Sequence, residues 1–317
     1  MNAPMLQPAP LHADIARGPD GGTAYWLPTR DGLQLRAGLW PAPDTAQGTV
    51  LLFPGRTEYI EKYGDTAAFF ATQGFATFAI DWRGQGLADR LLSNALLGHV
   101  DHFQKYQHDV DAMIETAKRL ELPKPWYLLA HSMGGAIGLR ALYEDLPVKA
   151  AAFSAPMWDI GLAQPLRSLA FGIGAFSNLF GFGQHLAPST SIKPYVNLQG
   201  FTGNLLTNDR DMYQMLRDHL SAVPELALSG PTINWVYEGL RECRELAKRP
   251  APGVPGFCTL GRQEEIVSTT AIHQRMDSWS EGELHVIDKV RHEVLMENPD
   301  LRHSVLTDIC TFFQKHR

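Results

Sequence analysis

A serine stands between an apolar run and a glycine-rich run in the stretch LLAHSMGGAIG, residues 128–138. Small residues flank Ser132 two positions away on each side, at Ala130 and Gly134. This spacing is typical of a strand-to-helix elbow, where the chain turns sharply and the serine hydroxyl projects from the carboxyl edge of a sheet. Ala130 departs from the glycine that usually precedes such a serine. The pattern predicts that Ser132 is a nucleophile.

A serine hydroxyl becomes a strong nucleophile only when a base takes its proton and an acid orients that base. In this strand-turn-helix architecture the three groups follow the chain order nucleophile, acid, histidine. Among the twelve histidines, His292 in DKVRHEVLMENP follows the last predicted strand and precedes the terminal helix. We therefore expect His292 to meet Ser132 at the carboxyl edge of the sheet.

The acid is expected in the loop LGRQEEIVS, which follows the predicted strand 257–260. Glu264 and Glu265 compete for this role, because successive loop residues point in different directions and only one can reach His292. Asp159 in SAPMWD, after the preceding core strand, is a further alternative.

The oxyanion of a tetrahedral intermediate needs N–H donors. The backbone N–H of Met133, at the start of the helix after the serine, is expected to be one. The loop FPGRTEYIEKY, after the predicted strand 49–53, is expected to supply the other from Arg56.

Short apolar or β-branched runs alternate with longer segments of helical period along the chain, which predicts parallel strands joined by helices. The expected fold is α/β, with a mostly parallel central sheet flanked by helices. The predicted strands are 33–40, 49–53, 76–80, 126–130, 150–153, 257–260 and 284–290. The predicted helices are 64–73, 102–120, 133–144, 235–247, 269–276 and 301–314.

The alternation breaks between two core strands, over residues 157–232. The stretch SLAFGIGAFSNLFGFGQHLAP there sets phenylalanines and leucines among glycines. We interpret 157–232 as a helical cap and expect Leu169, Phe171 and Phe176 to line the substrate site. Residues 1–24 are interpreted as a loose N-terminal arm, and 25–156 with 233–317 as the core.

Composition excludes several classes of protein. A net charge of -6 disfavours binding to nucleic acid. The three cysteines show no zinc or disulfide spacing and suit a reducing cytoplasm. We find neither a secretory signal nor an apolar run long enough to span a bilayer. Phenylalanines exposed on a cap would still allow transient contact with a membrane surface.

Two other motifs carry little chemistry. A dense group of histidines and acids lacks any complete metal-ligand spacing and is interpreted as helix surface; it comprises His99, Asp101, His102, His108 and Asp109. Gly84 and Gly86 lack the third glycine of a dinucleotide-binding loop and are interpreted as a turn. We therefore predict neither a metal nor a cofactor.

A set of sequence blocks spread over nearly the whole chain after residue 25 resembles, in order, the monoacylglycerol lipase and bacterial lysophospholipase family of α/β-hydrolases. The blocks are FPGRTEYIEKY, AIDWRGQGLADR, LLAHSMGGAIGLR, SAPMWDI, NLLTNDRDMY, GPTINW, LGRQEEIV and RHEVLMENP. The resemblance implies the α/β-hydrolase fold and an esterase that acts on single-chain acylglycerols or lysophospholipids, with the insert as a cap.

The same resemblance places Ser132 on the nucleophile and His292 on the base. It places Glu264 on a position usually held by aspartate, and Arg56 and Met133 on the oxyanion-hole positions. Three residues depart from the family pattern: Pro54 replaces a histidine, Ala130 replaces a glycine, and Glu264 replaces the acid.

These observations favour a cofactor-free carboxylic ester hydrolase that releases a fatty acid from single-chain lipids through an acyl-enzyme. Three alternatives stay open: the same residues acting as a peptidase, as a carbon–carbon bond hydrolase, or as part of a non-catalytic lipid-binding homologue. Epoxide hydrolases and dehalogenases are disfavoured, since their chemistry needs a carboxylate where Ser132 stands.

Overall fold

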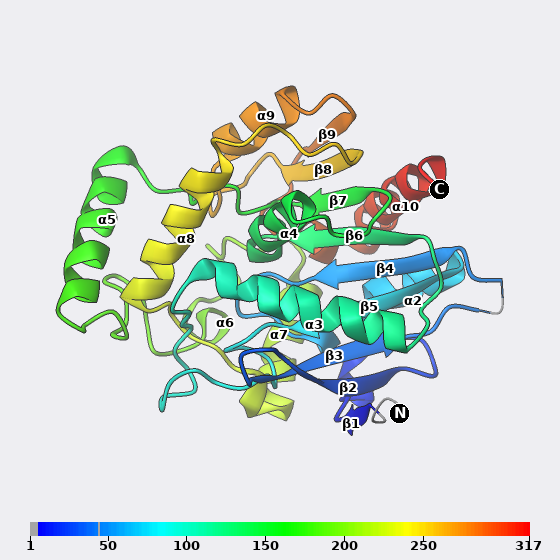
Figure 1. The fold of residues 1–317 in the computed structure, drawn as a ribbon, viewed down its shortest axis with the longest axis horizontal. Helices are drawn as coiled ribbons and strands as arrows, with labels where there is room; N and C mark the ends of the chain where they lie inside the picture. Colours follow the sequence, from blue (N-terminus) through cyan, green and yellow to red (C-terminus); the bar gives the residue numbers. More distant parts are fainter. Residues whose placement is uncertain (1–5, 44) are drawn as a thin grey trace.

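A nine-stranded sheet forms the centre of the molecule in the computed structural model, which describes residues 6–43 and 45–317 (Figure 1). Its strands lie in the order β1-β2-β3-β5-β4-β6-β7-β8-β9. Their bounds are β1 Gln7–Ala9, β2 Thr23–Pro28, β3 Gln34–Trp40, β4 Gly48–Phe53, β5 Phe75–Asp81, β6 Trp126–His131, β7 Ala151–Ser154, β8 Gly256–Gly261 and β9 Gly282–Ile287.

The strands from β5 across to β9 run parallel, whereas β1, β2 and β3 pair antiparallel at one side of the sheet. Buried side chains alternate between the two faces of the central strands, as the period of two requires. In β6, Leu128 and Ala130 pack in the core on one face, and Tyr127 and Leu129 pack in the core on the other. Both faces of the sheet are therefore covered.

Helices form the two outer layers. The core on one face contains residues of α3, α4, α8 and α9, and the core on the other contains residues of α2 and α10, which lie on opposite sides of the sheet in Figure 1. The bounds are α1 Ala13–Ala16, α2 Gly64–Thr72, α3 Tyr106–Arg119, α4 Met133–Tyr143, α5 Gln164–Leu179, α6 Tyr195–Leu198, α7 Arg210–Ala222, α8 Ile233–Leu246, α9 Thr269–Asp277 and α10 Pro299–Lys315. Short 3₁₀ turns are η1 Ile60–Tyr63, η2 Phe103–Lys105, η3 Pro224–Leu226 and η4 Val294–Met296.

The predicted fold class, a mostly parallel sheet between helices, is confirmed, and each predicted strand and helix is present with shifted ends. The observed ends of two elements differ most from the predicted ends. The last strand ends at Ile287, before a turn at Asp288 and Lys289, and the helix expected from residue 102 begins at Tyr106 after a 3₁₀ turn.

The prediction of a loose N-terminal arm is wrong for residues 6–24; residues 1–5 of that arm lie outside the described residues. Strand β1 pairs with β2, and α1 follows it. The arm is held because β2 and β3 form an antiparallel extension of the sheet, whose edge offers free backbone groups to β1.

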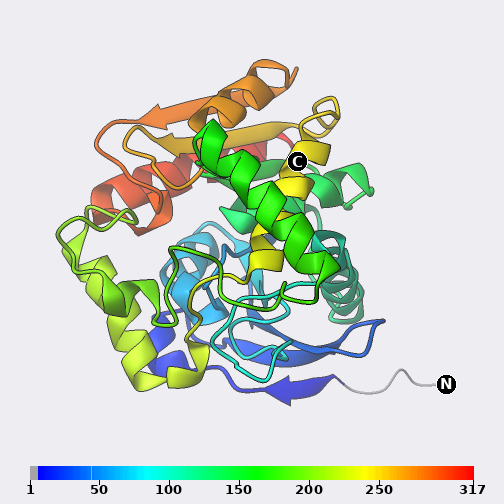
Figure 2. The same cartoon turned by 90° about the vertical axis from the view of Figure 1, so that its left-hand side faces the viewer.

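The insert between β7 and α8 carries α5, α6, α7 and η3. It lies beyond the carboxyl ends of the parallel strands, and Figure 2 views the molecule from that side, with α5 crossing in front. None of the helices in residues 6–43 and 45–317 has the length and apolar character needed to cross a membrane.

Candidate active site

Ser132 occupies the sharp turn between β6 and α4. Its backbone has φ 49° and ψ −117°, a combination that costs free energy for any residue with a Cβ atom. The close approach of backbone around the turn demands glycine at position 134, where a Cβ atom would lie 2.1 Å from the carbonyl oxygen of Phe53. The small residue predicted two positions after the serine is thus a steric requirement. Ala130 is accommodated within the buried strand.

Three side chains meet at this turn. Nε2 of His292 lies 2.8 Å from Oγ of Ser132, and Nδ1 of the same ring lies 2.7 Å from Oε2 of Glu264. All three residues are buried, and each comes from a loop or turn that follows a strand of the parallel sheet. The arrangement can pass a proton from the serine to the imidazole while the carboxylate holds the ring.

Glu264 is the acid that reaches His292. Burial alone would raise the pKa of Glu264, but the hydrogen bond and charge of His292, together with backbone N–H donors from Ile266 and Val267, outweigh it and lower that pKa. The two alternatives lie elsewhere. Glu265 is exposed, and Asp159 pairs with Arg167 at 2.5 Å.

The two predicted oxyanion-hole residues, Arg56 and Met133, both line the cavity that contains Ser132 and His292. Met133 is the first residue of α4, where backbone N–H groups have no partner within the helix. The loop that carries Arg56 is held by Gln85, whose side-chain amide donates to the carbonyl oxygens of Gly55 at 2.8 Å and of Glu58 at 3.1 Å. The backbone next to the serine is therefore fixed before a substrate binds.

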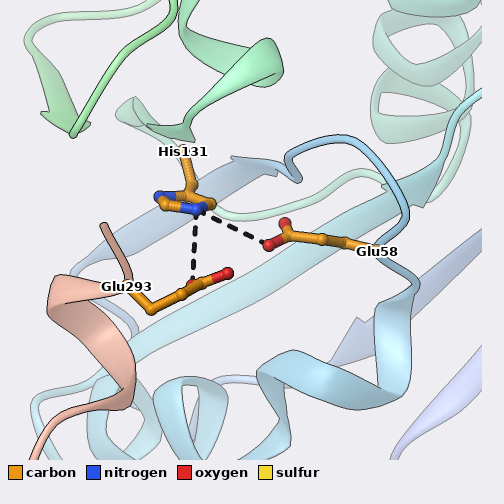
Figure 3. A group of neighbouring side chains, drawn as sticks. All are labelled: Glu58, His131 and Glu293. Carbon is orange, nitrogen blue, oxygen red and sulfur yellow. Dashed lines mark ion pairs between the residues drawn. The ribbon is translucent and has the colours of Figure 1, made fainter. Parts of the chain in front are cut away.

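A buried group of four charged residues, which we call the charge cluster, lies beside the catalytic histidine and consists of Glu58, Lys62, His131 and Glu293. Figure 3 shows the two carboxylates converging on the ring of His131. Nζ of Lys62 contacts Oε1 of Glu58 and lies 2.7 Å from Oε2 of Glu293. Glu58 also accepts hydrogen bonds from the N–H of Gly55 and from the hydroxyl of Tyr63. The cluster therefore joins the loop of Arg56 to the loop of His292.

The surroundings of His131 favour the doubly protonated form of its ring. Its Nδ1 lies 3.0 Å from the carbonyl oxygen of Ser154, which only accepts, so Nδ1 carries a proton. Its Nε2 lies 3.3 Å from Glu293 and 3.6 Å from Glu58, which favours a proton there too. Burial alone would lower the pKa of His131, but the charges of Glu293 and Glu58 outweigh it and raise that pKa. Two cations thus balance two carboxylates.

By residue type, Glu58, His131 and Glu293 could hold a metal ion, since their ligand atoms lie within 4.8 Å of one another. The chemistry of the group does not fit one. The ammonium of Lys62 already contacts both carboxylates, and the imidazolium form of His131 has no lone pair left to offer.

The group of histidines and acids near α3 is structural, but the prediction that it lies on a helix surface is wrong for two members. Asp109 is buried and binds Arg83 at 2.7 Å, and buried His99 contacts the hydroxyl of Thr232. Asp109 instead holds the loop after β5 through Arg83, and His99 fastens its loop to the start of α8. The predicted turn at Gly84 and Gly86 is present, with φ values of 80° and 56°.

The cavity above Ser132 has a volume of about 310 Å³ and is mostly apolar. Its apolar wall comes largely from the insert, but from residues that the sequence analysis did not select; they include Val196, Leu206, Leu216, Leu220 and Leu228.

None of the three predicted lining residues from α5 is among the residues of this cavity. Leu169 and Phe176 are 58% and 60% exposed. The ring of Phe171 packs instead against Tyr237 of α8. The prediction that these side chains line the substrate site is therefore wrong. Helix α5 packs on α8 through Gly174, where a Cβ atom would lie 2.5 Å from Tyr237, so the apolar face of α5 is turned outward.

Sequence reasoning also missed the charge cluster. Two signals could have pointed to it: His131 and Glu293 directly precede and follow the predicted nucleophile and base, and Glu58 and Lys62 stand four residues apart in the predicted oxyanion loop.

Comparison with known proteins adds a second line of evidence. The family described as serine aminopeptidase, S33, matches residues 44–299. Lysophospholipase L2 of Escherichia coli strain K12 is 29% identical over 285 residues, which cover 84% of this chain and 80% of that protein. Probable lysophospholipase L2 of Haemophilus influenzae is 28% identical over 265 residues, which cover 83% of this chain and 82% of that protein.

Solved structures with much lower sequence identity share the fold. A soluble variant of monoglyceride lipase from Saccharomyces cerevisiae, in complex with a substrate analogue, has a TM-score of 0.70 at 17% identity and covers 100% of this chain and 98% of that one. A thermostable carboxyl esterase from Bacillus coagulans has a TM-score of 0.73 at 17% identity and covers 93% of this chain and 98% of that one.

The fold and the Ser132–His292–Glu264 geometry define an α/β-hydrolase. Within that class, the chain belongs to the serine aminopeptidase family S33, whose match spans residues 44–299. The resemblance to bacterial lysophospholipases, found in the sequence blocks, is confirmed by the relatives named lysophospholipase L2, and the likeness to monoglyceride lipase shows a shared fold.

Proposed function

We propose that the protein is a serine carboxylic ester hydrolase that releases the fatty acid from single-chain lipids, as a lysophospholipase or a monoacylglycerol lipase. The observation that carries this proposal is the hydrogen-bonded chain from Ser132 through His292 to Glu264, which opens onto an apolar cavity of about 310 Å³. Relatives named lysophospholipase L2 support the substrate class.

The proposed reaction has two steps. In the first, Oγ of Ser132 attacks the ester carbonyl while Nε2 of His292 takes its proton, and the N–H groups of Met133 and Arg56 stabilise the oxyanion. Collapse of the intermediate expels the alcohol, which receives the proton from His292. In the second step a water molecule attacks the acyl-enzyme with His292 as base, which releases the fatty acid and restores Ser132.

The cavity favours a lipid over a peptide substrate. An aminopeptidase must bind the free ammonium of its substrate, which calls for an unpaired carboxylate near the serine. The two carboxylates among the cavity-lining residues, Glu58 and Glu293, already pair with Lys62 and His131. Apolar side chains make up most of the remaining wall, where each buried methylene of an acyl chain contributes about 0.8 kcal/mol.

Fatty-acid release from a monoacylglycerol, a lysophosphatidylcholine and a short aryl ester tests the proposal, with wild-type protein compared with Ser132→Ala. We expect release by the wild type and its loss in the variant. A fluorophosphonate should add mass at Ser132. Absence of both release and labelling would favour a non-catalytic role, whereas labelling without ester hydrolysis, combined with cleavage of peptide amides, would favour a peptidase.

We also propose that residues 157–232 form a cap that touches a membrane surface through α5 and the turn after it. The supporting observation is a row of side chains that are 52–79% exposed: Leu166, Leu169, Phe176, Leu179, Phe180 and Phe182. Such a patch is typical of an interaction surface. Sedimentation with phosphatidylglycerol vesicles tests it: Phe176→Ser combined with Leu179→Ser should reduce the bound fraction. Ile192→Ser, an exposed change outside α5, should leave that fraction unaltered.

A cytoplasmic location is part of the same proposal. Its support is the state of the three cysteines, Cys243, Cys258 and Cys310, which are buried and unpaired. Cell fractionation with detection of the native protein tests this location.

A further inference from the structure

Arg56 lines the active-site cavity, and its guanidinium has no anionic partner among the described residues. Its Nη2 donates to the carbonyl oxygen of Ser229 at 2.5 Å. The central Cζ atom of the guanidinium lies 5.1 Å from the ring centroid of Trp235. Its Nε is buried and has no hydrogen-bond partner. A guanidinium offers five N–H donors, so most of its capacity is unused.

Several buried arginines of the described chain are paired with carboxylates, whereas buried Arg275 donates only to the hydroxyl of Tyr143 and to two backbone carbonyl oxygens. Arg36 binds both Glu61 and Asp81, each at 2.7 Å, and Arg83 binds Asp31 and Asp109. Removing a cation from water without a counter-ion costs several kcal/mol. Burial lowers the pKa of Arg56 to about 10, so the group still carries its charge at neutral pH. An anion that entered the cavity would offset this cost.

The position of Arg56 defines where that anion would lie. Arg56 lines the same cavity as Ser132 and is proposed to supply an oxyanion N–H, while its side chain extends to Gly98, Ser229 and Trp235. The guanidinium lies over the ring of Trp235, and Nη2 donates to Ser229, so further N–H donors of the group remain for the oxygens of an anion. In a 1-acyl lysophospholipid the three glycerol carbons separate the ester from the phosphate, a span comparable to the length of an arginine side chain.

We propose that the side chain of Arg56 binds the phosphodiester of a lysophospholipid head group, while the backbone N–H of the same residue serves the oxyanion. This inference rests on the proposed ester hydrolase function and specifies its substrate. Guanidinium groups bind phosphate oxygens in bidentate fashion, and a neutral monoacylglycerol offers no such contact. The enzyme therefore selects lysophospholipids over monoacylglycerols.

The kinetic test compares kcat/KM for lysophosphatidylcholine with kcat/KM for a monoacylglycerol of the same acyl chain. A disturbed backbone at position 56 affects both substrates alike, so the ratio isolates the side chain. Arg56→Met should lower this ratio about 10- to 100-fold, the range for a charged hydrogen-bonded contact, and Arg56→Lys should lower it less. Arg262→Met, which removes an exposed arginine paired with Asp288, should leave the ratio unchanged. An unchanged ratio in Arg56→Met would overturn the proposal.

A binding measurement separates this proposal from the hydrolase function itself. In the Ser132→Ala background, calorimetry with a non-hydrolysable ether lysophospholipid should show at least tenfold weaker binding when Arg56→Met is added. Binding of the corresponding ether of glycerol should change little. If Arg56 instead binds the carboxylate of the released fatty acid, Arg56→Met will weaken binding of free fatty acid and spare the ether lysophospholipid, and the proposal is wrong. Failure of wild-type protein to hydrolyse any ester contradicts the proposed function alone.

Discussion

The ring of His131 lies 4.9 Å from the ring of His292, centroid to centroid, with the two planes tilted by 56°. In the proposed reaction His292 becomes an imidazolium, and the raised pKa of His131 favours a positive charge on that ring too, so the two rings would repel each other in the transition state. Glu58 and Glu293 supply the opposite charge beside His131. The charge cluster thus keeps the surroundings of the catalytic base electrically neutral.

Glu293→Gln leaves this cluster with a net positive charge next to His292. We expect kcat/KM at neutral pH to fall about tenfold, and the acidic limb of its pH profile to move to lower pH by about one unit, because one unit corresponds to 1.36 kcal/mol. The profile should be measured with a short aryl ester. Glu293→Asp keeps the charge and should leave the limb in place. An acidic limb that moves upward in Glu293→Gln would contradict the role given to the cluster.

His131→Asn tests the same cluster through stability. The pKa of His131 is raised in the folded state, so its stabilising contribution is complete below the unfolded value of about 6.5 and is lost as pH rises through the folded value. At pH 6 the free energy of unfolding of the variant should be about 3 kcal/mol lower than that of the wild type. This difference should be smaller at pH 9. Urea unfolding at both pH values measures it. Exposed His273→Asn is the matched control, and a difference independent of pH would refute the assignment.

Much of the site could be predicted, because short sequence patterns near the ends of strands identify its residues. The elbow at Ser132 has a local steric signature, and His292 and Glu264 follow strands whose carboxyl ends meet at the same sheet edge. The charge cluster has no steric signature, although His131 and Glu293 adjoin the predicted nucleophile and base. Glu58 and Lys62 belong to residue types that are mostly exposed, and only the tertiary fold brings them to His131.

The sequence pattern also did not predict which face of α5 is turned outward. An apolar stripe predicts that a helix packs on something, but it does not say which face meets the core. In this chain Gly174 decides the matter, because only a glycine allows the close approach of α5 to Tyr237. Leu169 and Phe176 consequently point away from the cavity that the sequence analysis assigned to them.

Glu264→Gln should lower kcat by about four orders of magnitude. The amide cannot stabilise the imidazolium and can favour the wrong tautomer of His292, as in other enzymes with this arrangement. Rates with an aryl ester measure the loss. Glu265→Gln changes the adjacent, exposed residue in the same way and should retain the wild-type rate. Equal losses in the two variants would show that the loop, and not the carboxylate at position 264, is needed.

Leu216→Ala tests the acyl-binding wall. Leu216 on α7 is buried at the cavity, and its truncation removes apolar contact worth about 0.8 kcal/mol for each methylene-sized group. We expect the ratio of kcat/KM for a long-chain ester to that for a short-chain ester to fall about 10- to 30-fold, with both esters kept below their aggregation limits. Leu169→Ala makes the same change on the exposed face of α5 and should leave the ratio unaltered. If Leu169→Ala lowered the ratio and Leu216→Ala did not, the acyl chain would bind along α5, and the wall formed by α7 would have no part in chain-length selection.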